Sequence, residues 1–286
     1  NKRDTYDGMN KAVIDKKAGR YDNIGALTIE YSGNNTKSEG EGFAMLNVPN
    51  AYAEGDRITV TLPAGQTWLA LSISSKMGES LIYCPNGTFT YTFGKYLENS
   101  YPSSVDTAKD THYVNNVIFA RIPRADEINN TRNLAQNVYD LKSGTGGFPH
   151  VTSVGDHDNY AFAGRCAIDG FSSNTDGHTK FPNQSWGPDQ TPEDNEITVD
   201  FGREVTLERL EIIIRYDTTN NHDTYFKKAV VTFSDGSTQE LEMVNTADVQ
   251  CFELGAKKTT KMTLSGFEVA DTAKWAAISE IRAIGE

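Results

Sequence analysis

The segment 132–285 carries the clearest structural pattern of this chain. It reads CAIDG at 166–170, FPNQSWG at 181–187, VDFG at 199–202 and ISEIRAIG at 278–285. Short runs rich in Val, Ile and Phe alternate here with Gly, Asp, Asn and Pro, which is typical of β-strands joined by tight turns. The first half of the chain has the same rhythm. We therefore predict an all-β protein.

The chain of 286 residues is long enough for two domains of ordinary size. We expect an extended lead-in over 1–23, a β-sandwich over 24–125, a linker over 126–131 and a second β-sandwich over 132–286. Each sandwich can bury a core of its own.

Individual strands follow from alternation and from turn residues. Ile58, Val60 and Leu62 occupy every second position of 57–62, as a half-buried antiparallel strand requires. Trp68 to Ile73 is read in the same way. Three consecutive isoleucines at 212–214 predict a strand that is buried on both faces.

Two turns predict hairpins. Pro85-Asn86-Gly87 separates two apolar runs, and Asn-Gly tolerates the positive φ of a tight turn. Ser234-Asp235-Gly236-Ser237 separates two more. Between the domains, the sequence predicts a short helix within 125–134, with Asp126 as its N-cap.

Charge and hydropathy limit the partners. The net charge is −12 and the mean hydropathy is −0.52. A surface this acidic repels phosphate backbones, so nucleic acid is not expected as a partner. No run of 18 apolar residues is present, so insertion into a membrane is not expected. Neutral sugars carry no such penalty, and Ca²⁺ is attracted.

Three cysteines, Cys84, Cys166 and Cys251, fit no zinc motif. We expect three buried free thiols. A bridge between Cys166 and Cys251 is the alternative.

The motifs quoted above, together with RNLA at 132–135, resemble in order and spacing the discoidin domain (coagulation factor five/eight type C), above all its bacterial carbohydrate-binding relatives. The resemblance implies a galactose-binding-domain-like jelly roll over 132–286 that holds glycans without cutting them. It also implies a bacterial extracellular or cell-surface location, with further domains of a larger surface protein as partners. The first domain more weakly resembles the β-sandwich domains that precede this discoidin type in bacterial surface proteins.

The resemblance further implies a structural Ca²⁺. Its ligands are expected to be Asp169, Asn174 and Thr175 in one loop, and Glu280 on the last strand. Hard oxygen ligands in a tight loop suit this ion. The alternative is an Asp-Gly turn with ordinary bonds between side chain and backbone.

A sugar site needs a flat aromatic face and rigid polar groups. In the second domain, we take the candidates from loops that a sandwich brings to one edge: Trp186, His178, Arg215, Asp217, His222, Asp223, Tyr225 and Trp275. Trp68 is the candidate in the first domain.

Each candidate also has a structural interpretation. Trp186 can belong to the core, and Tyr225 can open a strand. Arg215 and Asp217 can form a buried ion pair, and Trp68 can border the first core.

No nucleophile elbow, zinc-protease motif, phosphate loop or dinucleotide motif is present in the sequence. We predict a non-catalytic module that binds a polysaccharide or oligosaccharide, such as starch, another plant polysaccharide or a host glycan. The alternatives are a protein-adhesion module and a glycan-degrading enzyme with its site between the domains.

Overall fold

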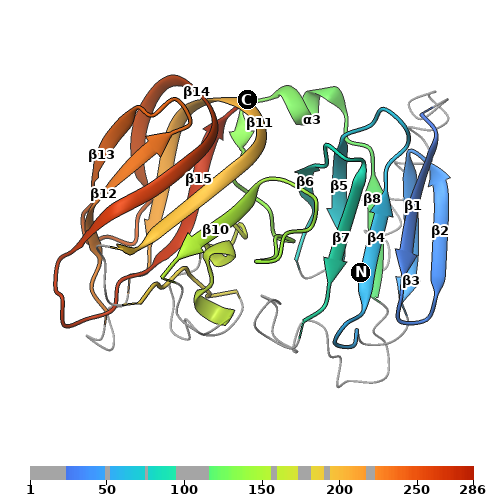
Figure 1. The fold of residues 1–286 in the computed structure, drawn as a ribbon, viewed down its shortest axis with the longest axis horizontal. Helices are drawn as coiled ribbons and strands as arrows, with labels where there is room; N and C mark the ends of the chain where they lie inside the picture. The colour runs from blue at the N-terminus through green and yellow to red at the C-terminus, as the bar shows by residue number, and fades with distance from the viewer. Residues whose placement is uncertain are drawn as a thin grey trace.

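A computed structural model gives the fold, and it describes residues 24–48, 52–74, 77–94, 116–155, 160–172, 182–189, 194–216 and 223–286. The predicted lead-in over 1–23 lies outside these ranges. Figure 1 shows two β-rich halves side by side, with a short helix across the top between them. The chain is all-β, as predicted, with antiparallel sheets throughout.

Two four-stranded sheets make up the first half. The first has the order β2-β1-β4-β7 and consists of β1 (Ala26–Tyr31), β2 (Thr36–Glu41), β4 (Arg57–Thr61) and β7 (Thr88–Thr92). The second has the order β3-β8-β5-β6 and consists of β3 (Phe43–Val48), β5 (Trp68–Ser72), β6 (Ser80–Tyr83) and β8 (Asn116–Arg121).

The alternation expected for two of these strands is confirmed. Ile58 and Val60 of β4 are fully buried, as are Leu69 and Leu71 of β5. These side chains belong to one apolar cluster to which both sheets contribute. The first half is thus a sandwich held together by its shared core.

The hairpin predicted at Pro85-Asn86-Gly87 is wrong. Gly87 has the positive φ of 68° that the turn needs, but β6 pairs with β5 while β7 pairs with β4. The turn therefore carries the chain from one sheet to the other. Asn-Gly permits a tight turn but does not select the partner strand, which long-range pairing decides.

The second half is one hydrogen-bonded network around a second core. Its order is β13-β12-β14-β11-β15-β9, with β10 also paired to β11. The strands are β9 (Arg132–Asn133), β10 (His150–Val154), β11 (Glu196–Ile214), β12 (Phe226–Phe233), β13 (Thr238–Glu242), β14 (Gln250–Val269) and β15 (Ile278–Gly285). Two 3₁₀ turns, η1 (Tyr160–Phe162) and η2 (Gly164–Ala167), complete it.

The long strand β11 runs through a bulge. Its register with β14 shifts between Asp200 and Val205, where Gly202 has a φ of 66°. Such a bulge bends a strand without ending it. The isoleucines at 212–214 are buried, and the hairpin at Ser234 to Ser237 pairs Thr232 with Thr238, so both of these predictions are confirmed.

The helix between the halves, α3 (Ala125–Asn129), is shorter than predicted, and Asp126 is not its cap. Arg124 holds the N-cap position, and its backbone N–H donates to Glu127 Oε2 at 2.6 Å. Asp126 Oδ1 instead accepts from Arg124 Nε at 2.8 Å. The observed cap therefore lies two positions before the predicted one.

The segment 137–148 lies against the first sandwich, although the predicted boundary assigns it to the second domain. Tyr139 is fully buried in the first core, and its hydroxyl accepts from the Ile73 N–H at 3.0 Å. Thr90 of β7 donates its backbone N–H to the Thr145 carbonyl at 2.8 Å. Tyr83 of β6 and Phe148 exchange two backbone hydrogen bonds of 2.9 and 2.8 Å. This segment thus covers the outer edges of β7 and β6.

All three cysteines are free. Cys84 and Cys166 are buried, as expected, but Cys251 is exposed on β14, so its predicted burial is wrong. Within the described ranges, no helix is long and apolar enough to cross a membrane.

Candidate functional site

Four of the predicted ligand residues lie together at one end of the second sandwich. Arg215 follows the last residue of β11, Asp223 and Tyr225 precede β12, and Trp275 precedes β15. Asp223 and Trp275 form a backbone bridge, and the Thr224 N–H donates to the Trp275 carbonyl at 2.7 Å. We call Arg215, Asp223, Tyr225 and Trp275 the loop-end cluster.

Arg215 and Asp223 form a buried, two-pronged ion pair. Arg215 Nη2 donates to Asp223 Oδ1 at 2.8 Å, and Nε lies 2.8 Å from Oδ2. The two side chains are 7 % and 2 % exposed, and the guanidinium lies 5.5 Å from the centre of the Phe162 ring. The pair therefore fixes the loop before β12. Asp217, which the sequence offered as the partner of Arg215, lies outside the described residues.

Trp275 and Tyr225 are partly exposed, and Tyr225 also packs against the second core. A small hollow of about 20 Å³ lies beside Trp275 and is lined by Pro188, Asp189, Asn195, Phe226, Val269, Thr272, Lys274 and Ala276. That is about the size of one water molecule. The cluster thus presents aromatic surface next to an amide, an ammonium and a carboxylate.

Trp186 is not available to a ligand, so that candidate is wrong. Its side chain is fully buried, with ring centres 5.3 Å from Phe267 and 6.3 Å from Phe226. Its backbone exchanges hydrogen bonds with Ile278 at the start of β15. The core interpretation is the one that holds. His178 and His222 lie outside the described residues and stay predictions.

Trp68 lies elsewhere, at the start of β5 beside Tyr83, with 5.3 Å between the ring centres. The guanidinium carbons of Arg132 and Arg203 lie 5.3 and 5.1 Å from the centre of its indole ring. No pattern in the sequence predicts the contact with these arginines, because β9 and the bulge of β11 are distant from Trp68 along the chain.

Asp169 and Glu280, two of the expected calcium ligands, lie close enough for their charges to interact. Both are buried, and the Gly170 N–H donates to the two Glu280 carboxylate oxygens at 3.2 and 3.3 Å. Asp169 Oδ2 is buried and has no hydrogen-bond partner within the described ranges. Burial raises the pKa of Asp169, and burial and the charge of Asp169 together raise the pKa of Glu280. A cation would offset both effects.

The other two expected ligands, Asn174 and Thr175, lie outside the described residues. Among the residues that are described, no three His, Cys, Asp or Glu side chains gather as metal ligands. The two carboxylates and their unpartnered oxygen suit a hard cation.

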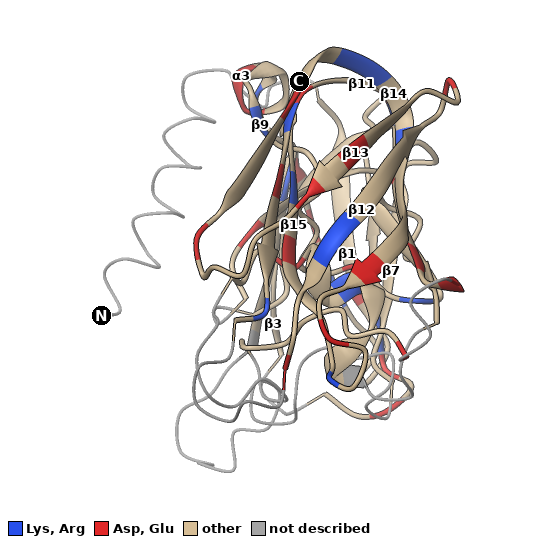
Figure 2. Ribbon diagram, turned by 90° about the vertical axis from the view of Figure 1, so that its left-hand side faces the viewer, with Lys and Arg blue, Asp and Glu red and all other residues tan. Residues whose placement is uncertain are grey.

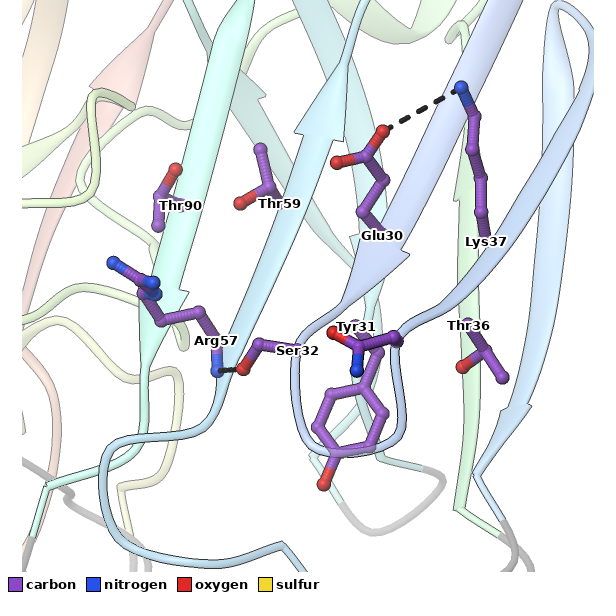
Figure 3. A pocket seen from close by; sticks show the side chains of 9 residues that line it. Glu30, Tyr31, Ser32, Thr36, Lys37, Arg57, Thr59 and Thr90 are labelled. Carbon is purple, nitrogen blue, oxygen red and sulfur yellow. Dashed lines mark hydrogen bonds and ion pairs between the residues drawn. The ribbon is translucent and has the colours of Figure 1, made fainter.

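A larger, polar groove of about 540 Å³ lies on the outer face of the sheet β2-β1-β4-β7. Figure 3 shows its lining, with Glu30 and Lys37 pointing toward one another at 3.6 Å and Thr59 and Thr90 on neighbouring strands. Tyr31 is the aromatic residue in the lining, but it is buried and its hydroxyl donates to Asp56. The groove therefore offers no flat aromatic face to a sugar.

Comparison with protein-family models matches residues 151–284 to a domain of unknown function, DUF7402. This match spans just under half of the chain. A comparison with curated protein sequences found no match.

Several solved structures are similar in part. A chitosan-binding module of a chitosanase/glucanase from Paenibacillus sp. IK-5 is 15 % identical, with 55 % of this chain and 100 % of that chain covered and a TM-score of 0.38. A fucose-binding module from Streptococcus pneumoniae is 15 % identical, with 53 % and 96 % covered and a TM-score of 0.37. A family 32 carbohydrate-binding module of C. perfringens NanJ, in complex with galactose, is 13 % identical, with 47 % and 91 % covered and a TM-score of 0.36. Likenesses at this level do not decide the function of this chain.

Proposed function

We propose that this chain is a non-catalytic carbohydrate-binding unit whose loop-end cluster holds a glycan. The observation that carries the proposal is the position of Trp275, partly exposed beside a buried ion pair and a polar hollow. A pyranose ring presents a C–H face to an indole and hydroxyl groups to amides and charged groups. Because Arg215 and Asp223 fix the neighbouring loop, the aromatic face is held in place before the ligand arrives.

The proposal extends to the ligand class and the location. Neutral polysaccharides suit a chain with a net charge of −12 better than nucleic acid does. Starch and other plant polysaccharides are the first candidates among them. An extracellular bacterial location rests on the discoidin resemblance alone.

The proposal also includes a structural Ca²⁺ bound by Asp169 and Glu280, with Asn174 and Thr175 as further ligands. The buried carboxylate pair and the unpartnered Asp169 Oδ2 support it. Its role would be to hold the loop after η2 against β15.

Affinity electrophoresis against starch, glycogen, xylan, mannan, pectin and mucin tests the proposal. We expect one polymer to retard the protein and the variant Trp275→Ala to bind it about tenfold more weakly, which corresponds to about 1.4 kcal/mol. Trp275→Phe keeps an aromatic face and should bind almost as well as the parent chain.

Val244→Ala is the surface control, because Val244 is 62 % exposed and is not part of the cluster. If no polymer retards the folded protein, the glycan hypothesis fails and a protein partner becomes the leading alternative. Turnover of any polymer would instead indicate an enzyme.

A further inference from the structure

The most unusual charge arrangement in the described part of the molecule lies where the two halves meet. Arg132 of β9 and Arg203 in the bulge of β11 each place a guanidinium over the indole of Trp68, at 5.3 and 5.1 Å from the ring centre. Each of the three residues is partly exposed. We call Trp68, Arg132 and Arg203 the seam cluster.

Most of the other arginines that the structure describes have acidic partners. Arg121 contacts Glu79 and Glu127, Arg209 contacts Glu211, and Arg215 contacts Asp223. Figure 2 shows basic segments at β9 and near the top of β11 and β14. The lysines of β14 in that region are also paired, Lys257 with Asp235 at 2.6 Å and Lys258 with Glu204 at 3.5 Å.

The two arginines of the seam cluster have no carboxylate partner among the residues that the structure describes. Arg132 Nη1 donates to the Asn133 carbonyl at 3.4 Å, and Arg203 Nη1 donates to the Glu204 carbonyl at 3.2 Å. Arg132 Nε is buried and has no acceptor within the described ranges. Burial of a guanidinium N–H without an acceptor costs free energy, so the position of Arg132 Nε indicates that an acceptor from a bound partner belongs there.

The two charges also act on each other. Burial and the nearby charge of Arg203 lower the pKa of Arg132 to about 10, and burial lowers the pKa of Arg203. Both groups remain charged near neutral pH. Cation–π contact with Trp68 explains where the guanidiniums lie. It does not explain why two cations in an acidic chain approach one another without an anion.

The position of Arg203 is held by packing. Gly202 has a φ of 66°, and a Cβ at this position would overlap the Phe148 ring. Phe148 is itself hydrogen-bonded to Tyr83 of β6, opposite Trp68 in the register of β5 and β6. The bulge therefore rests on the first sandwich, and the cluster draws residues from both halves.

We propose that the seam cluster is a second binding site, which takes an oxyanion carried by a glycan: the carboxylate of a uronic acid or a sulfate ester. Guanidinium groups match the geometry of such oxygens, and two of them can bind one anion from different directions. This inference rests on the proposed glycan-binding function only for the kind of molecule that carries the anion. The anion site itself does not depend on that function. Because the chain has a net charge of −12, nonspecific attraction would not hold a polyanion.

Matched polymer pairs test this site on the full chain by affinity electrophoresis. Polygalacturonate is compared with its methyl ester, and dextran sulfate with dextran, so that each pair differs in its anionic groups. We expect one charged polymer to retard the protein and its neutral counterpart to retard it less. Retardation by polygalacturonate assigns the carboxylate, and retardation by dextran sulfate assigns the sulfate.

The decisive variants are Arg203→Gln and Arg203→Lys. We expect Arg203→Gln to weaken binding of the charged polymer about tenfold or more, and Arg203→Lys to weaken it less, because the charge stays while the planar fork is lost. Arg209→Gln is the matched control, an arginine on the same strand with a carboxylate partner. A thermal melt confirms that each variant is folded. Arg132→Gln is a second test should the bulge not tolerate changes at Arg203.

The two sites can be told apart. Binding of a charged polymer that Arg203→Gln abolishes and Trp275→Ala leaves unchanged supports the seam site, whatever the neutral polymers do. The proposal is overturned if neither charged polymer retards the protein, or if Arg203→Gln binds as well as Arg209→Gln. Binding that depends on Trp275 and not on Arg203 would leave only the loop-end site.

Discussion

At the scale of single residues, the three cysteines show how differently one side chain can behave in this fold. Cys84 and Cys166 are fully buried, whereas Cys251 is exposed on β14. Burial raises the pKa of Cys84 to about 12, so almost no thiolate forms there near neutral pH. The reactive form of Cys84 is thus both scarce and inaccessible.

We expect a thiol reagent such as DTNB at pH 8 to modify one cysteine per folded chain and all three in denaturant. Cys251→Ser should remove the reaction of the folded protein. Modification of two or three thiols before unfolding would contradict the burial of Cys84 and Cys166.

The carboxylates of Asp169 and Glu280 give a second prediction at this scale. Burial raises the pKa of both groups, so the folded chain holds more protons than the unfolded chain. Without a cation, stability should therefore fall as the pH rises above the unfolded values of about 4. Ca²⁺ binds the deprotonated form, so its stabilising effect should be larger at pH 7 than at pH 5.

Thermal melts with CaCl₂ and with EGTA measure this effect. Glu280→Gln should abolish the calcium-dependent shift of Tm. Glu204→Gln, which changes a side chain that is 65 % exposed, should retain it. An equal shift in both variants would contradict a site at Glu280.

At the scale of elements, the bulge of β11 depends on a residue without a side chain. Gly202 combines a φ of 66° with contact to the Phe148 ring, whereas Gly236 in the β12–β13 turn has a φ of 81° and open space around it. We expect Gly236→Ala to cost about 1 kcal/mol, from backbone strain alone. Gly202→Ala should cost about 2 to 4 kcal/mol, because overpacking adds to the strain.

Urea unfolding of both variants measures the difference. Equal losses of unfolding free energy would show that Phe148 moves aside without cost.

Local sequence patterns predicted several strands and turns. They could not predict which strands pair with one another. Alternation placed β4 and β5, and the turn at Asp235-Gly236 placed the hairpin of β12 and β13. The turn at Asn86-Gly87 has the predicted backbone and yet joins two sheets, because a turn does not specify its partner strands. Similarly, no signal in the sequence shows that β11 continues through its bulge.

The candidate site was predictable to a similar extent. Loop position brought Arg215, Asp223, Tyr225 and Trp275 into one list, and the structure brings them together. An aromatic side chain between turn residues can point into the core or toward solvent. The sequence pattern therefore could not show that Trp186 belongs to the core. The seam cluster could not be predicted, because three segments distant in sequence meet there.

At the scale of the whole molecule, the first sandwich does not end where its last strand ends. Val138, Tyr139 and Leu141 belong to its core, and Thr145 and Phe148 hydrogen-bond to the edges of β7 and β6. These contacts follow the linker that the sequence predicts over 126–131. The first half therefore takes part of its core and both edge contacts from the chain that leads into the second half.

We expect a fragment of residues 24–131 to lack a cooperative thermal transition, whereas a fragment of residues 24–149 should have one. Tyr139→Ala in the longer fragment should cost about 3 to 5 kcal/mol, since it empties a fully buried site. Far-UV circular dichroism and urea unfolding measure both effects. A cooperative transition of the same midpoint in both fragments would show that the segment 137–148 is dispensable.

Two other strands, β2 and β13, each lie at the end of a sheet and have a neighbouring strand on one side only within the part of the chain that the structure describes. They read TKSEGE and TQELE, so charged side chains recur along each open edge. An uncovered edge is a template on which a second copy can add its own strand, and charges at such an edge disfavour that addition. Copies of this chain at high local concentration can therefore lie side by side and remain separate molecules rather than growing into a shared fibre.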